Sequence, residues 1–188
     1  ELDDEITSFS VASLIGELVE SYKPTPRVVE FLKSVELDLI KNSALIRGGD
    51  EQQMPFMQLM PEDVTKRRYA VNVIVSGDPE SSAPVIIEER PTYTHLVGRV
   101  EHRAHMGTLT TDFSLIRGGA LHRANGGYLV LDARRLLTEP FAWDTLKQAL
   151  KSKCIKIESI EEAYAITATV ALEPEPIPLK VKVALIGD

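Results

Sequence analysis

The chain has 188 residues, of which 44% are hydrophobic and 26% charged; these globular values exclude a disordered or collagen-like chain. Its 21 basic and 28 acidic residues give a net charge of −7, which disfavours a general binder of nucleic acids or acidic membranes. The single cysteine, Cys154, excludes an intrachain disulfide and favours a reducing, cytoplasmic location. No apolar run approaches the ~20 residues that cross a bilayer.

Two amphipathic helices are predicted near the N-terminus. Residues 3–22 and residues 26–42 each place apolar side chains at helical spacing. A proline-containing turn separates them, and Thr25 can cap the second helix with Pro26 at its favoured first position. Helices joined by so short a turn should pack antiparallel, so we expect a helical hairpin domain over residues 1–48. The apolar stripe of the first helix comprises Ile6, Phe9, Ile15, Leu18 and Tyr22.

Residues 49–68 are predicted to form an irregular connector. Three of the four Met residues and two Pro fall here without a clear period. Met fills irregular gaps well, so packing against a core is the simpler interpretation than a peptide-binding surface.

The residue pattern changes at residue 69, where alternating, β-branched segments typical of strands begin. A helix is predicted over residues 140–151, with Phe141, Leu146 and Leu150 toward a sheet. We therefore expect an α/β core over residues 69–188 with a β-hairpin before its last strand. The predicted strands are Tyr69–Val75, Val85–Ile87, Tyr128–Leu131, Cys154–Glu158, Tyr164–Val170 and Val181–Ile186, of which the fourth and fifth form the hairpin.

The chemically informative feature is the apolar run Tyr128–Leu131, which ends in Asp132. A buried strand that ends in an aspartate presents a carboxylate at the carboxyl edge of a sheet, where ligands of α/β sheets bind. Such a carboxylate can hold Mg²⁺, and the metal offsets phosphate charge, as in a Walker B strand. The pattern alone also fits an aspartate that caps the following turn.

Several segments around this run carry a family resemblance: Gly119–Gly127, Pro91–His102, Pro140–Leu150, the hairpin region 154–170 and Leu172–Asp188. They resemble the Lon-like branch of the AAA+ ATPases, in the group whose ATPase core carries a helical insertion and precedes a Lon-type protease domain. The resemblance covers residues 69–188 well and residues 1–68 more loosely. It implies a partial AAA+ (P-loop NTPase-like) parallel sheet, with Asp132 as the Walker B-like ligand of Mg²⁺ and ATP.

The chain departs from that family pattern at several points. No G-x-x-x-x-G-K-[ST] phosphate loop occurs, and the position after Asp132, usually a catalytic Glu, holds Ala133, whose methyl group cannot act as a general base. Asp188 stands near the candidate sensor 1 position. We expect the phosphate loop upstream of Glu1 and a Ser–Lys protease dyad downstream, so this chain would be a fragment that neither binds ATP tightly nor cleaves protein alone.

Arginines concentrate between Arg90 and Arg135, where seven occur without a lysine. The planar guanidinium matches phosphate and carboxylate groups, so we expect a surface that faces nucleotide or a neighbouring subunit. Arg117 and Arg123 are the candidates for phosphate or inter-subunit contacts. Ordinary surface salt bridges are the alternative for each.

Three functions remain open from the sequence. The first is part of an ATP-dependent Lon-like serine protease, whose homo-oligomeric (hexameric) ring would use ATP and Mg²⁺ to unfold protein substrates. The second is a non-enzymatic interaction module with a vestigial nucleotide site, in which the helical hairpin and the Met-rich connector dock a partner. The third, a relative of DNA-unwinding rings, is disfavoured by the acidic net charge, because DNA binding depends on phosphate neutralisation.

Overall fold

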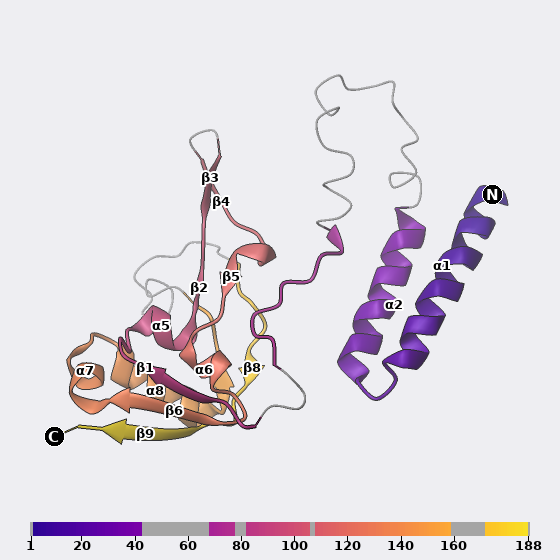
Figure 1. The fold of residues 1–188 in the computed structure, drawn as a ribbon. Helices are drawn as coiled ribbons and strands as arrows, with labels where there is room; N and C mark the ends of the chain where they lie inside the picture. Colours follow the sequence, from indigo (N-terminus) through magenta and orange to yellow (C-terminus); the bar gives the residue numbers. More distant parts are fainter. Residues whose placement is uncertain (1, 43–67, 78–81, 106–107, 159–171, 188) are drawn as a thin grey trace. The chain divides into compact units, whose positions relative to one another are not determined.

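The computed structural model describes residues 2–42, 68–77, 82–105, 108–158 and 172–187 (Figure 1). The chain divides into two compact units, Glu1–Ala70 and Val71–Asp188, and each is described by itself. The predicted strand Tyr164–Val170, nearly all of the predicted connector and Asp188 lie outside the described residues. In the described ranges, no helix combines the length and apolar character needed to cross a membrane.

The N-terminal unit contains helices α1 (Leu2–Ser21) and α2 (Pro26–Lys41), which lie side by side and antiparallel (Figure 1). Thr25 occupies the N-cap of α2 with Pro26 after it, but its side chain accepts no capping hydrogen bond. The predicted apolar stripe of α1 is only partly covered: Ile15 is 8% exposed, whereas Phe9 is 80% exposed. Two helices alone cannot enclose a whole apolar stripe, so much of it remains open.

The second unit is built on three parallel strands in the order β1-β6-β9. These strands are β1 (Val85–Glu88), β6 (Tyr128–Asp132) and β9 (Lys182–Ile186). The predicted α/β class with a parallel sheet is therefore confirmed. The central strand β6 buries Leu129 and Leu131 on one face, but Tyr128 is 42% exposed and Val130 half-buried. The burial of both faces that a continuous apolar run predicts is therefore wrong for this strand.

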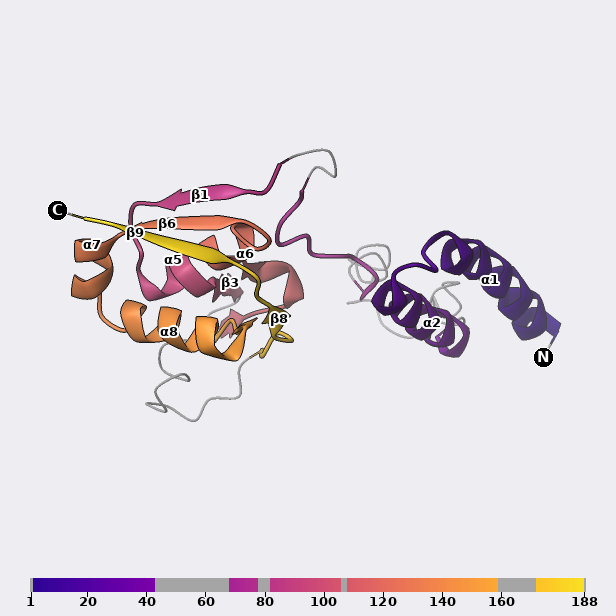
Figure 2. The ribbon, with the colours of Figure 1, turned by 90° about the horizontal axis from the view of Figure 1, so that it is seen from below.

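Helices cover one face of this sheet, as Figure 2 shows from below. Alternate residues of β6 point to that face and join one apolar core with the helices. The covering helices are α5 (Tyr93–Val97), α6 (Ala120–Arg123), α7 (Ala133–Thr138) and α8 (Ala142–Ser152). The fully buried core side chains include Leu96, Leu121, Leu129, Leu131, Leu136, Leu146 and Ile155.

Three short antiparallel ladders complete the described part of the unit. The first is β2 (Arg99–Val100) with β5 (Ile116–Arg117), which the 3₁₀ helix η2 (Phe113–Leu115) precedes. The others are β3 (Arg103–His105) with β4 (Thr108–Thr110), and β7 (Cys154–Ile155) with β8 (Ile177–Pro178).

The predicted strand Tyr69–Val75 is wrong, because these residues form no strand among the described residues and the chain bends at Ile74. A side chain connects this segment to the rest of the unit instead: Nδ2 of Asn72 donates to the carbonyl oxygens of Phe113 (2.9 Å) and Ile116 (3.0 Å). A β-branched, alternating sequence is thus not sufficient to form a strand where no neighbouring strand pairs with it.

Smaller corrections concern the region after Asp132. Helix α7 was not predicted. The helix expected from residue 140 begins at Ala142, because Phe141 adopts a left-handed conformation (φ 65°) that a helix cannot contain. Phe141 and Leu150 are each 39% exposed, so the buried face of α8 consists of Ala142, Leu146 and Ala149. The strand predicted over 154–158 is limited to β7.

Candidate functional site

Asp132 closes the central strand of the parallel sheet and is exposed to solvent. In the ladder with β9, Asp132 pairs with Ile186. In the ladder with β1, the residue before it, Leu131, pairs with Glu88. Since all three strands run in the same direction, their carboxyl ends meet at one edge. This is the edge at which α/β sheets bind ligands.

The carboxylate of Asp132 also caps helix α7. Its Oδ1 accepts a hydrogen bond of 2.8 Å from the backbone N–H of Arg135. The capping role that the sequence left as an alternative is therefore present in the structure. One oxygen suffices for it, and within the described ranges Oδ2 has no hydrogen-bond partner, so the two roles are compatible.

Ala133 lies at the same edge, next to the end of β9. A Cβ atom built on Gly187 would be 3.3 Å from the Cβ of Ala133. Position 133 therefore adjoins the chain as it leaves β9, and its methyl group offers no acceptor for a proton. The candidate sensor 1 residue, Asp188, follows Gly187 in sequence but lies outside the described residues.

A second carboxylate at this edge, Glu88, was missed by the sequence analysis. Its side chain is 12% exposed; Oε2 accepts from Nη2 of Arg123 at 2.9 Å, and Oε1 accepts from the backbone N–H of Arg90 at 3.0 Å. Nδ1 of His95 lies 3.6 Å from Oε1. The signal was available, because Glu88 directly follows the predicted strand Val85–Ile87. Arg123, a predicted phosphate contact, is thus engaged by Glu88.

Arg117, the other predicted phosphate contact, is similarly engaged. Its Nε donates to Oε2 of Glu101 at 2.9 Å, while Nη2 of Arg99 donates to Oε1 at 2.6 Å. The two guanidinium groups, Arg117 first, lower the pKa of Glu101 below its usual value. Arg117 and Arg123 are each about half exposed. Each forms an ion pair at the surface with a carboxylate of the same chain, so neither guanidinium is free.

Comparison with known proteins decides the family. A sequence model of the LonB-like AAA domain matches residues 81–188, more than half of the chain. The chain belongs to the LonB-like AAA domain family. Over 73 residues, 39% of the chain, it is 32% identical to the "Putative Lon protease homolog" of Escherichia coli (strain K12), and this alignment covers 12% of that relative's length.

The donor set of this LonB-like AAA domain fits one part of a Mg²⁺–nucleotide site. Mg²⁺ keeps several waters and is bound through one or two carboxylates together with substrate phosphates. Exposed Asp132, with a free Oδ2, meets that requirement. In the described part of the chain no three His, Cys, Asp or Glu side chains gather to hold a metal by themselves, and the sequence contains no phosphate-loop motif for the triphosphate.

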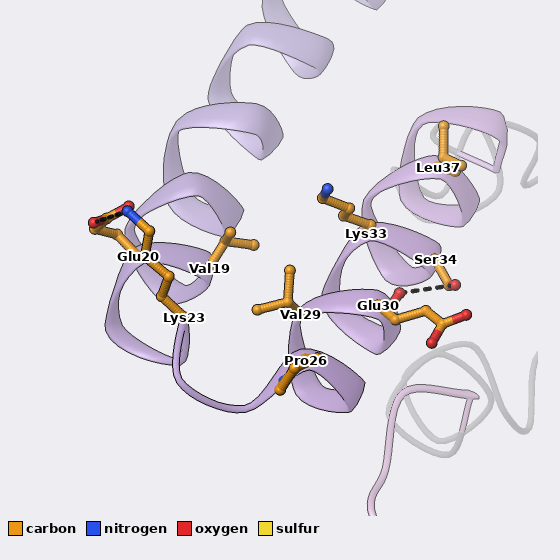
Figure 3. Close-up of a pocket in the computed structure, with 9 residues that line it drawn as sticks. All are labelled: Val19, Glu20, Lys23, Pro26, Val29, Glu30, Lys33, Ser34 and Leu37. Atoms are coloured by element: carbon orange, nitrogen blue, oxygen red, sulfur yellow. Dashed lines mark hydrogen bonds and ion pairs between the residues drawn. The ribbon is translucent and has the colours of Figure 1, made fainter.

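A separate groove lies within the helical unit that precedes the AAA domain match. It has a volume of about 600 Å³ and lies between α1 and α2 near their turn (Figure 3). Val19 and Val29 face each other across it, and Leu37, which is largely exposed, extends the apolar lining along α2. The charged residues of its rim are Glu20, Lys23, Glu30 and Lys33, of which Glu20 and Lys23 form an ion pair of 3.0 Å.

Proposed function

We propose that this chain forms part of the ATPase module of an ATP-dependent Lon-like serine protease. In the complete protein, a homo-oligomeric, hexameric ring in the cytoplasm would unfold protein substrates and pass them to a protease chamber. One observation carries the proposal: the carboxylate of Asp132 is exposed at the carboxyl end of a strand with parallel neighbours on both sides. Membership of the LonB-like AAA domain family supports it.

Within this proposal each edge residue has a defined role. Asp132 holds Mg²⁺ through Oδ2, directly or through water, and Mg²⁺ offsets the phosphate charge of ATP. Ala133 cannot activate a water molecule, so ATP hydrolysis is slow, or bound nucleotide acts as a structural switch. Arg117 and Arg123 contact phosphate or a neighbouring subunit only after they release Glu101 and Glu88.

The test is Asp132→Asn in the complete protein. Asn keeps an acceptor for the α7 cap, so the fold is retained while the negative charge for Mg²⁺ is lost. We expect ATP-stimulated degradation of casein to fall at least tenfold, with unchanged thermal unfolding. Glu139→Gln, a charge removal at the end of α7, is the matched control and should keep full activity. Unchanged ATP stimulation in the Asp132 variant would overturn the proposal.

A second candidate, a non-enzymatic interaction module, is favoured by the groove between α1 and α2 (Figure 3). An apolar lining with charges of both signs at its rim fits the apolar face of an amphipathic partner helix. Leu37→Glu would place a charge in that lining and should abolish co-purification of a partner, whereas Asp132→Asn should leave that co-purification unchanged. Loss of ATP-stimulated proteolysis by Asp132→Asn, with co-purification of partners unaffected by Leu37→Glu, would favour the first function.

A further inference from the structure

Arg135, in the first turn of α7, connects the ends of two strands at the carboxyl edge of the sheet. Its backbone N–H donates to Oδ1 of Asp132 at the end of β6 (2.8 Å), and its Nη1 donates to the carbonyl oxygen of Glu89 just after β1 (2.7 Å). Figure 2 shows α7 at the end of the sheet toward which β1 and β9 point. One residue therefore links the carboxylate of Asp132 to the neighbouring strand.

The turn after β1, which Arg135 contacts, is itself held in place. The backbone N–H of Arg90 donates to Oε1 of Glu88 at 3.0 Å, and the carbonyl oxygen of Arg90 accepts from the N–H of Thr92 at 2.7 Å. Pro91, between them, is fully buried. The carbonyl group of Glu89 therefore offers a fixed acceptor to the guanidinium group that reaches it from α7.

Helix α7 is short and buries little of its own surface. It contains six residues, of which Leu136 is the buried one. A helix of this length is not stabilised sufficiently by its own hydrogen bonds, so contacts with the rest of the unit must hold it. The orientation of its first turn, and with it the rotamer of Asp132, therefore depends on the packing of Leu136 and on the two hydrogen bonds of Arg135.

We propose that Arg135 is a positioning residue, which keeps Oδ2 of Asp132 available for Mg²⁺ by holding α7 against the turn after β1. This role rests on the function proposed above, in which Asp132 binds Mg²⁺ and nucleotide. Hydrogen-bond partners of a metal-binding carboxylate fix its orientation, and their loss typically weakens metal binding by about 10- to 100-fold. Arg135 contacts neither the metal nor the phosphates and acts through Asp132.

The test measures Mg²⁺-dependent binding of a fluorescent, non-hydrolysable ATP analogue to the complete protein. Arg135→Ala removes the hydrogen bond to Glu89 but keeps the backbone N–H that caps to Asp132, and it should weaken this binding by about tenfold. Arg135→Lys keeps a side-chain donor and should restore most of the affinity. Arg134→Ala, the matched control, removes the same charge from the neighbouring exposed residue and should bind as the parent protein does.

Two further measurements separate positioning from direct contact with phosphate. In EDTA, where Asp132 has no metal to bind, Arg135→Ala should bind the analogue as the parent protein does, whereas the loss of a phosphate contact would persist. The double variant of Asp132→Asn and Arg135→Ala should bind no more weakly than Asp132→Asn alone, because both substitutions act on the same interaction.

A third measurement needs no nucleotide. The first turn of α7 should exchange its amide hydrogens faster in Arg135→Ala than in the parent protein, because its link to the turn after β1 is lost. Arg134→Ala, which breaks no hydrogen bond among the described residues, should exchange as the parent protein does.

The positioning role of Arg135 and the proposed function fail in different ways. If the complete protein binds no nucleotide, or if Asp132→Asn leaves Mg²⁺-dependent binding unchanged, the proposed function fails and the role of Arg135 with it. If Asp132→Asn weakens that binding, four results would overturn the positioning role alone: unchanged binding in Arg135→Ala, an equal loss in Arg134→Ala, a loss that persists in EDTA, or additive losses in the double variant.

Discussion

The backbone N–H of Gly119 donates a hydrogen bond to Nδ1 of His122 within the first turn of α6. The imidazole is almost wholly enclosed, and burial lowers the pKa of His122 to about 4. Protonation would remove the Nδ1 acceptor and place a charge in the interior. The neutral ring is therefore part of the structure that holds the Gly118–Gly119 turn.

The unfolding free energy should depend on pH through this residue. In the unfolded chain the imidazole takes a proton near pH 6.5, whereas in the folded chain it does so only near pH 4. The stabilisation is thus fully present above pH 6.5 and is lost as the pH falls toward 4, by up to about 3 kcal/mol. Urea unfolding of the chain between pH 7.5 and 4 measures it.

Substitution of His122 separates this contribution from that of the carboxylates. His122→Phe should flatten the pH dependence between 6.5 and 4, and at pH 7 it should cost about 1–3 kcal/mol because the N–H of Gly119 loses its acceptor. His102→Gln, at an exposed position, is the control and should follow the parent chain. A pH profile of His122→Phe that parallels the parent would contradict the prediction.

Arg117 offers a test of ion pairing against a role in activity. Arg117→Gln removes the largest cause of the lowered pKa of Glu101, so that pKa should rise, as NMR titration of the carboxyl group would show. Exposed pairs contribute little, so the unfolding free energy should change by less than about 1 kcal/mol. In the complete protein, ATPase activity should fall by more than the small change in unfolding free energy explains. Activity that falls only in proportion to stability would leave Arg117 with a structural role alone.

The sequence predicted secondary structure best where the local residue pattern of a segment was sufficient to define its conformation. The apolar run of β6 predicted a strand, although only one of its faces is buried, and Asp132 ends that strand as expected. Strand β1 was found for the same reason, since its β-branched residues lie between turn signals. These signals are local, and tertiary contacts here agree with them.

The remaining features depend on contacts between distant residues. The β propensity of Tyr69–Val75 predicted a strand, but a strand also needs a neighbour with which to pair. The side chain of Asn72 instead donates hydrogen bonds to the carbonyl oxygens of Phe113 and Ile116. The ion-pair partners of Arg117 and Arg123 could not be predicted from the sequence either, because Glu101 and Glu88 lie 16 and 35 residues away. Spacing along the chain does not reveal which charges meet in space.

The cap of α7 predicts a graded effect of substitutions at Asp132 on stability. Asp132→Ala removes the acceptor for the N–H of Arg135 and should lower the unfolding free energy by about 1 kcal/mol. Asp132→Asn and Asp132→Ser keep an acceptor and should cost only a few tenths of a kcal/mol. Urea unfolding of the three variants at pH 7 compares them. Equal losses for Ala and Asn would show that charge, not the cap, stabilises this end of the helix.

The absence of a side chain at Gly127 allows the start of β6 to approach the start of β1 closely. A Cβ at this position would overlap the backbone of Pro84, whose nitrogen would lie 2.8 Å from it, and the carbonyl of Pro84 accepts the N–H of Tyr128 at 2.8 Å. Gly127→Ala must therefore push the two strands apart at their first hydrogen bond, and we expect a loss of more than about 2 kcal/mol of unfolding free energy. Gly77→Ala, where a Cβ meets nothing within 4 Å, is the matched control and should change stability by less than about 1 kcal/mol. If urea unfolding gave the same midpoint for both variants, close approach at Gly127 would not be what holds β1 against β6.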